Sequence, residues 1–110
     1  MKIKQHKWTK DKGWETLLPV EFQRPPQVVF VFGGREPLKD PKSFSEIKSM
    51  YPHSHIISCS TAGEIFDNQV SDNTISLAAV LFDKTQLNFQ EVGVSSSSES
   101  YEAGKKLANN

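Results

Sequence analysis

The chain has 110 residues, the length of one ordinary domain, which can bury a hydrophobic core without disulfide bonds. Thirteen basic and thirteen acidic residues cancel, which argues against nucleic acid or an anionic membrane as the main partner. The single cysteine excludes an internal disulfide framework, the first residues lack the apolar core of a secretory signal, and no apolar run approaches the ~20 residues of a membrane span. We therefore expect a cytoplasmic protein.

The first part of the chain predicts peripheral elements. Residues 2–8 are typical of an exposed edge strand that is kept soluble by charge, since five of the first twelve residues are lysines. A phosphate- or membrane-binding patch is the alternative interpretation of these lysines. Residues 11–13 form a turn signal, and residues 14–18 favour one or two helical turns that end at Pro19.

The next part of the chain predicts a buried strand followed by a helix. Residues 28–32 are apolar at every position and end in Gly33 and Gly34, which is typical of a strand in the middle of a sheet. Asp40 and Pro41 predict the start of a helix, with the aspartate as N-cap and the proline in the first turn. Apolar side chains at spacings of three and four give this helix one stripe: Phe44, Ile47, Met50 and Tyr51.

A strand at residues 55–59 completes a βαβ unit. Residues 67–73 are turn-rich, with one short strand at their start. Residues 75–82 predict another buried strand, and residues 87–94 predict its antiparallel hairpin partner, with a bulge near Gln90-Glu91 where the apolar phase changes. A serine-rich loop with capping chemistry then leads into a helix whose apolar face consists of Tyr101, Gly104, Leu107 and Ala108. The expected fold class is α/β: a mixed sheet with one βαβ unit and an antiparallel hairpin, and helices packed on the sheet.

A polar loop follows the strand at residues 55–59 and is the candidate site. In α/β proteins small ligands collect at the carboxyl ends of strands, where small residues let backbone N–H groups turn inward toward an anion. Two glycines end the neighbouring strand and should face the same pocket. The residues expected to bind a ligand are Gly33, Gly34, Ser58, Ser60, Thr61, Gly63 and Glu64. The alternative is that Ser60 and Thr61 only satisfy a turn while Glu64 faces water.

The glycine at position 63 and the single cysteine carry two further expectations. Gly63 ends a run of small residues, so we expect it to need a positive φ or close backbone packing. We expect Cys59 to be buried and inert, because His53 and His55 lie at the opposite end of its strand and cannot act as its base. No catalytic residue and no metal site are therefore expected, although an open-site ligand role for a histidine is the alternative.

The polar loop also carries a family resemblance. The run Cys59-Ser60-Thr61-Ala62-Gly63-Glu64-Ile65, after an Ile-Ile strand, resembles the signature of the FIST domain, named for F-box and intracellular signal transduction proteins. Residues 70–73, ahead of the apolar residues 75–82, and residues 104–107 match the order of elements in the family. The resemblance extends from about residue 28 to residue 107, and Ser58 replaces the glycine that the family usually has.

The resemblance implies a sensory, non-catalytic input domain of a bacterial signalling protein that binds a small ligand, with amino acids among the candidates. No cofactor is expected, although some related proteins are linked to haem and nitric oxide sensing. An enzyme that uses Cys59 or Glu64, and a structural dimerisation module, are the competing interpretations. Because the sequence ends within a predicted helix, we expect residues 1–110 to be a partial FIST N-terminal domain that forms a homodimer through residues 87–110.

Overall fold

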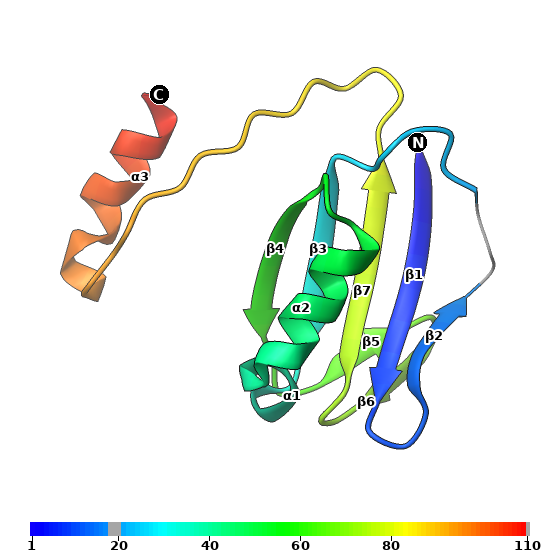
Figure 1. The fold of residues 1–110 in the computed structure, drawn as a ribbon. Coiled ribbons are helices and arrows are strands. Elements are labelled where there is room, and N and C mark those ends of the chain that lie inside the picture. Colours follow the sequence, from blue (N-terminus) through cyan, green and yellow to red (C-terminus); the bar gives the residue numbers. More distant parts are fainter. Residues whose placement is uncertain (18–20, 110) are drawn as a thin grey trace.

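The computed structural model describes residues 1–17 and 21–109. Its centre is a five-stranded sheet with the strand order β2-β1-β7-β3-β4 (Figure 1). Its strands are β1 (Lys2–Thr9), β2 (Gly13–Leu17), β3 (Val28–Gly33), β4 (His55–Ser60) and β7 (Ile75–Leu81). Only β3 and β4 run parallel, and the other neighbouring strands are antiparallel. The prediction of a mixed α/β sheet is confirmed.

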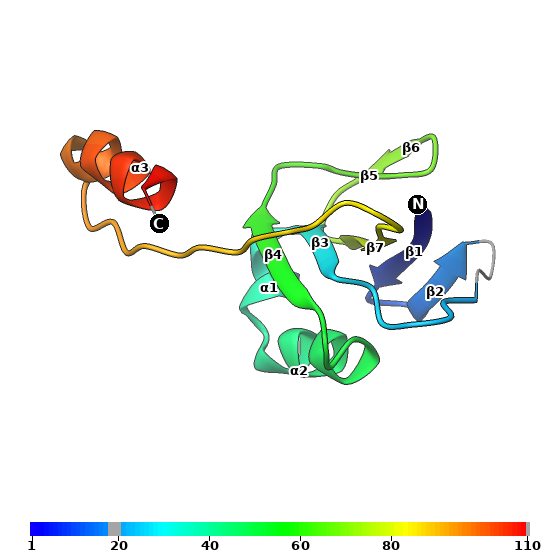
Figure 2. The same ribbon diagram turned by 90° about the horizontal axis from the view of Figure 1, so that it is seen from above.

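The predicted βαβ unit is also confirmed. The short helix α1 (Arg35–Lys39) and the helix α2 (Pro41–Met50) connect β3 to β4. The carboxylate of Asp40 accepts a hydrogen bond of 3.0 Å from the backbone N–H of Lys42, which is the N-cap arrangement that the sequence predicts. The helices α1 and α2 lie on one face of the sheet, which we call the covered face (Figure 2).

The hydrophobic core lies between the covered face and α2. It is built from alternate residues of β3 and β7 together with two residues from the helix side: Val29, Val31, Ile75, Leu77, Ala79, Ile47 and Tyr51. All seven are buried, and Ile56 and the two tryptophans pack at the margin. Burial of a large aliphatic side chain contributes about 1.5–3 kcal/mol, so this cluster is the main stabilising unit of the sheet.

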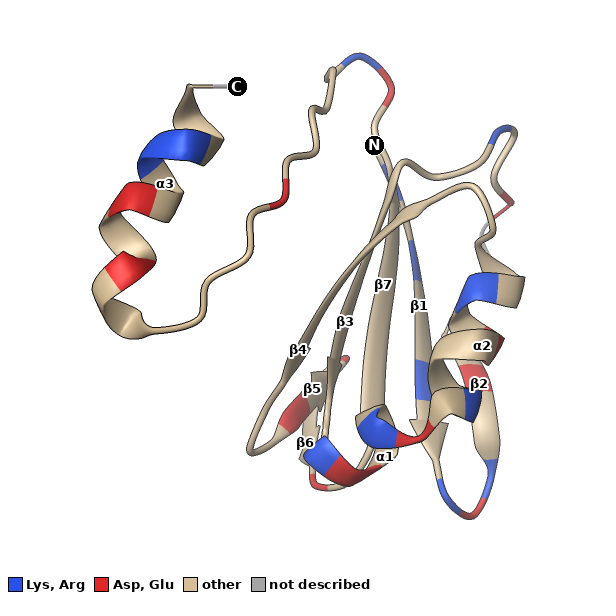
Figure 3. Ribbon diagram, turned by 60° about the vertical axis from the view of Figure 1, so that its left-hand side comes forward, with Lys and Arg blue, Asp and Glu red and all other residues tan. Residues whose placement is uncertain are grey.

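The opposite face of the sheet has no helix against it, and we call it the open face. The registers of the ladders place Phe30 opposite Ile57 and Phe32 opposite Cys59 on this face, with residues 76 and 78 of β7 beside them. The side chains of Phe32 and Ile57 are 46% and 48% exposed. The strands β3, β4 and β7 carry no lysine, arginine, aspartate or glutamate (Figure 3).

The N-terminal elements differ from two predictions. The strand β1 is not an edge strand, because β2 pairs with one side of it and β7 with the other. Residues 14–17 belong to a strand and not to a helix. The side chains of Trp14 and Thr16 lie on the covered face of the sheet, and those of Glu15 and Leu17 lie on the open face. This alternation is the two-residue period of a strand. The remainder of that prediction, at Leu18 and Pro19, lies outside the described residues.

The predicted hairpin between residues 75–82 and 87–94 is wrong. Both edges of β7 already pair, with β1 on one side and β3 on the other, so no edge remains for a further strand. Residues 82–96 instead form an extended segment without strand pairing, here called the arm, and the predicted bulge near Gln90-Glu91 therefore does not exist. The arm contacts the sheet where the ring of Phe89 stacks on His55, with 3.8 Å between ring centroids.

Beyond the arm lie a 3₁₀ turn η1 (Ser97–Glu99) and the helix α3 (Ser100–Ala108). The carboxylate of Glu99 accepts hydrogen bonds of 3.0 Å from the backbone N–H and the hydroxyl of Ser95, but neither η1 nor α3 has a side-chain hydrogen bond at its N-cap, so the capping that the sequence predicts does not form. Figures 1 and 2 show α3 standing clear of the sheet.

A two-stranded antiparallel hairpin, β5 (Glu64–Phe66) and β6 (Gln69–Ser71), occupies the region where the sequence predicts one short strand. Its two-residue connection holds Asp67 in the left-handed region, with φ of 56°. Aspartate tolerates this region better than most residues do. The hairpin leads directly from the candidate site into β7.

Candidate functional site

The candidate site lies where β3 and β4 end side by side. Gly33 is opposite Ser60 in the parallel ladder, and the backbone N–H of Thr61 donates a 2.8 Å hydrogen bond to the carbonyl of Gly33. The N–H of Gly34 donates a 2.9 Å hydrogen bond to the carbonyl of Thr74. The two predicted loops therefore meet, and the segment just before β7 joins them.

Glu64 holds these segments together from inside. Its side chain is only 2% exposed, so the alternative in which Glu64 faces water is wrong. One carboxylate oxygen accepts hydrogen bonds from the N–H and the hydroxyl of Thr74, at 2.8 and 2.9 Å, and the other accepts one of 2.8 Å from the hydroxyl of Thr61. No cation pairs with it in the described part of the chain. Since both oxygens are engaged, Glu64 positions the loop, and Thr74 is a partner that the sequence analysis missed.

The glycines of the site permit close packing and do not line an open cavity. A Cβ atom at Gly33 would lie 2.9 Å from Leu38 Cγ, and one at Gly34 would lie 2.9 Å from Asn73 Cα.

Gly63 differs from its prediction. Its φ is not in the left-handed region, and an added Cβ would be 3.4 Å from Val70 Cγ1, an ordinary contact. The reason is that the sharp change of direction occurs later, at Asp67 and Asn73, which both have positive φ.

Ser58 and Ser60 supply the accessible polar groups of the site. They alternate with Cys59, so their side chains share the covered face of β4 with Ile56. Both residues are exposed and lie on β4, which is an edge strand of the sheet. Their hydroxyls can donate and accept hydrogen bonds beside the fixed loop.

Cys59 is exposed and not buried as predicted. The sequence places it at the end of an apolar strand, but β4 is an edge strand, and Cys59 points to the open face where no helix covers it. Its thiol donates a 3.4 Å hydrogen bond to the carbonyl of Ser60. The nearest histidine along the strand, His55, is four residues away, or about 13 Å at ~3.3 Å per residue. No group of three potential metal ligands occurs among residues 1–17 and 21–109.

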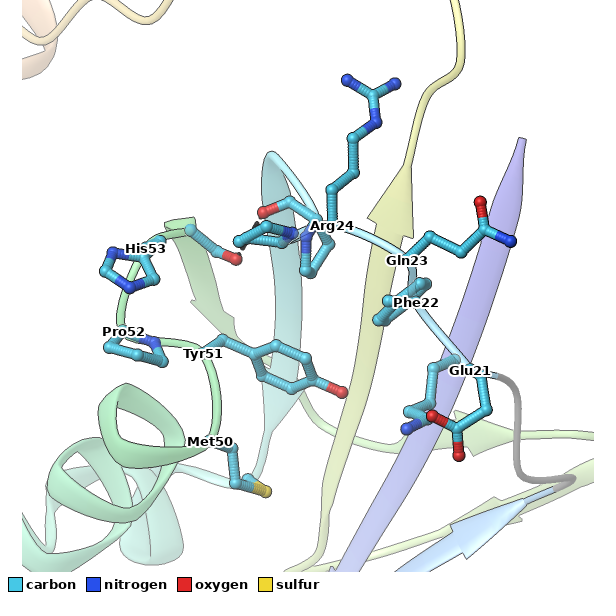
Figure 4. A pocket seen from close by; sticks show the side chains of 12 residues that line it. Glu21, Phe22, Gln23, Arg24, Met50, Tyr51, Pro52 and His53 are labelled. Atoms are coloured by element: carbon cyan, nitrogen blue, oxygen red, sulfur yellow. Dashed lines mark hydrogen bonds between the residues drawn. The ribbon is translucent and has the colours of Figure 1, made fainter.

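A hollow at the opposite, amino end of the parallel strands is the second candidate. It has a volume of about 450 Å³ and lies between residues 21–26 and residues 50–54, with Lys4 at its side (Figure 4). The guanidinium of Arg24 points out of the hollow and donates hydrogen bonds of 2.7 and 3.2 Å to the carbonyls of Phe82 and Asp83. The hydroxyl of Ser54 donates a 2.6 Å hydrogen bond to the carbonyl of Pro26. Arg24 and Ser54 thus hold this part of the chain together through their hydrogen bonds to backbone carbonyls.

A buried polar cluster lies beside this hollow. The hydroxyl of Tyr51 is 2.6 Å from His6 Nε2, and His6 Nδ1 is 2.9 Å from the hydroxyl of Thr16. Burial, with a smaller contribution from the positive charge of Lys4, lowers the pKa of His6 below 6.5. Burial also raises the pKa of Tyr51 to about 12. Both side chains are therefore neutral at pH 7.

His6 should make the protein less stable in mild acid. Because its folded pKa lies below the unfolded value of 6.5, the unfolded chain binds the proton first. Stability is complete above pH 6.5 and falls as the pH drops toward the folded pKa, with a slope of at most about 1.4 kcal/mol per pH unit for one site. Urea unfolding at pH 7.5, 6.5 and 5.5 measures the free energy of unfolding of the parent and of His6→Gln. The difference between the two should shrink as the pH falls. The exposed His53→Gln variant should follow the parent, and a constant gap for His6→Gln would contradict the prediction.

Comparison with known proteins assigns a family. The model of the FIST N domain matches residues 27–110, so the chain belongs to the FIST N domain family, as its resemblance predicts. This family is associated with sensory domains of signal transduction proteins. No curated protein and no solved structure matches the chain at a significant level. Within residues 1–17 and 21–109, no helix combines the length and the apolar composition that crossing a bilayer requires.

Proposed function

We propose that this chain is a non-catalytic sensory domain that binds a small polar ligand, an amino acid or a related carboxylate, at the carboxyl ends of β3 and β4. The observation that carries the proposal is the pairing of a loop fixed by the buried Glu64 with two exposed hydroxyls, those of Ser58 and Ser60. A preorganised loop loses little conformational entropy when a ligand binds, which favours affinity for a small molecule.

The roles within the proposed site follow from exposure and hydrogen bonding. Ser58 and Ser60 contact the ligand with their hydroxyls, and the loop at the exposed Ala62 and the half-buried Gly63 offers backbone N–H groups to a carboxylate. Thr61 and Glu64 hold that loop in place through their mutual hydrogen bond. Gly33 and Gly34 let the neighbouring segments approach without a side chain between them.

Two observations favour binding over catalysis. The thiol of Cys59 is on the opposite face of β4 from Ser58 and Ser60, with no imidazole within hydrogen-bond reach, so it lacks an activating base. Glu64 is 2% exposed and both of its carboxylate oxygens already accept internal hydrogen bonds, which disfavours proton transfer to it from a substrate. The balanced charge argues against nucleic acid and membrane partners, and the single cysteine fits a cytoplasmic domain.

A thermal-shift screen of the twenty amino acids, simple dicarboxylates and haem tests the proposal. A ligand present at a hundred times its Kd stabilises the native state by about 2.7 kcal/mol, which raises Tm by roughly 10 °C in a domain of this size. The double variant Ser58→Ala/Ser60→Ala should keep its Tm without ligand, because both residues are exposed, and should lose the ligand-dependent shift. Ser45→Ala, an exposed serine on α2, is the matched control and should retain the shift.

The opposite results would overturn the proposal. If none of these compounds raises Tm, the chain does not bind the proposed class of ligand. If the double variant responds to a ligand as the parent does, a ligand binds, but the site is not at the ends of β3 and β4.

A further inference from the structure

The open face is an apolar surface that the described part of the chain covers only toward its ends, where the hairpin β5–β6 contacts Ser76 and where Phe89 of the arm stacks on His55. Ile3, Phe32 and Ile57, from three different strands, are between 42% and 48% exposed, and Phe30 and Ala78 between them are half-buried. None of the strands β3, β4 and β7 contributes a lysine, arginine, aspartate or glutamate to it. Soluble monomers seldom expose a contiguous apolar surface of this kind, whereas a helix packed on such a face is a standard layer of α/β domains.

The helix α3 has an apolar stripe that packs on no other element within residues 1–17 and 21–109, although Lys105 of the same helix lies over the ring of Tyr101. Tyr101, Gly104, Leu107 and Ala108 follow one another at helical spacing, and the side chain of Tyr101 is 76% exposed. The other side of the helix faces the arm, where Glu91 and Val92 lie beside Lys106, and Ala103 is buried. A Cβ atom at Gly104 would meet nothing within 4 Å, so the middle of the stripe is open.

We propose that two copies of the chain associate, with the stripe of α3 in each copy packed on the open face of the other. The extended arm carries α3 away from its own sheet, so that each chain offers both a helix without a sheet and a sheet face without a helix (Figures 1 and 2). In a dimer with a two-fold axis, the same helix-on-sheet contact forms twice, so both apolar surfaces of both copies are buried. The assembly therefore closes at two copies. The inference is independent of the ligand site, which lies on the covered side of β4.

Sedimentation velocity at 5–100 µM tests the association. The parent chain should sediment as a dimer at tens of micromolar. Ile57→Lys places a charge on the open face and should weaken the dimer at least tenfold. Phe44→Lys is the matched control, because Phe44 is similarly exposed but lies on α2, and this variant should remain dimeric. A monomeric parent, or equal effects of the two substitutions, would overturn the proposal, and thermal melts should show that both variants are folded.

Chemical cross-linking distinguishes exchange between copies from closure within one chain. The parent, whose only cysteine is Cys59 on the open face, is mixed with a Cys59→Ser/Gly104→Cys chain and treated with a short bismaleimide. The proposal expects a covalent heterodimer. The control chain Cys59→Ser/Lys106→Cys has its cysteine on the side of α3 that faces the arm. It should give much less of the covalent heterodimer. A third chain carries Gly104→Cys and retains Cys59. If its cross-linked product has only the mass of a monomer, α3 packs on the sheet of its own chain, which contradicts the proposal.

Discussion

Replacing Glu64 with alanine should destabilise the protein by about 3 kcal/mol. The substitution leaves the N–H and hydroxyl of Thr74 and the hydroxyl of Thr61 without their acceptor in a site that is 2% exposed. Hydrogen bonds to a charged acceptor contribute about 1.5–3 kcal/mol each in net terms, and buried donors left without partners cost about 1–3 kcal/mol. The changes are coupled through one side chain, so they do not add in full. Urea unfolding at pH 7 measures the loss directly.

Two further variants separate the hydrogen bonds of Glu64 from its volume. Glu64→Gln keeps the shape and one acceptor oxygen for Thr74, so it should lose about half as much stability as alanine does. Glu36→Ala removes an exposed carboxylate from α1 and should stay within about 0.5 kcal/mol of the parent. Equal stabilities of Glu64→Ala and Glu36→Ala would show that the buried carboxylate does not hold the loop.

Gly34→Ala should destabilise the protein by about 2 kcal/mol. Gly34 has φ of −60° and ψ of 150°, which alanine adopts without strain, so the effect is steric. The new Cβ would be 2.9 Å from the Cα of Asn73, a backbone atom that cannot rotate away, and the shift would reach the Gly34–Thr74 hydrogen bond. Forcing an extra methyl group into a packed site typically costs about 1–3 kcal/mol.

Gly93→Ala is the matched control for this prediction. Gly93 lies on the arm, and an added Cβ would have no atom within 4 Å. It should therefore unfold at nearly the same urea concentration as the parent. If Gly34→Ala matches it, the segment at Asn73 yields easily, and the three segments of the candidate site are not held rigidly together.

The elements that the sequence predicts correctly are those with strong local signals. Residues 28–32 are apolar at every position, and Asp40-Pro41 is a strong helix start, so β3 and α2 could be placed before the structure was known. The prediction of a helix at residues 14–18 was wrong because it relied on the following proline as the end of a helix. The alternation of their side chains between the two faces of the sheet became clear only from their pairing with β1.

The remaining errors come from information that is not local. Residues 87–94 have an apolar pattern suited to a strand, but whether they pair depends on β1, which occupies the edge of β7 that the hairpin would need. The exposure of Cys59 depends on the absence of a helix over one face. The site segments at Gly33, Ser60 and Glu64 were predicted from composition, whereas the inward orientation of Glu64 depends on Thr74, ten residues later.

The position of β1 between β2 and β7 also bears on how the chain folds. Ile3 pairs with Val80 of β7, so the first strand to be synthesised must wait for the last strand of the sheet. Until then it has only β2 as a neighbour, and an isolated two-stranded hairpin is marginally stable at best. Contacts between such distant segments slow folding because a long loop must close before they form. The sheet should therefore assemble late, and changes near the N-terminus should act on the folding rate more than on the distant candidate site.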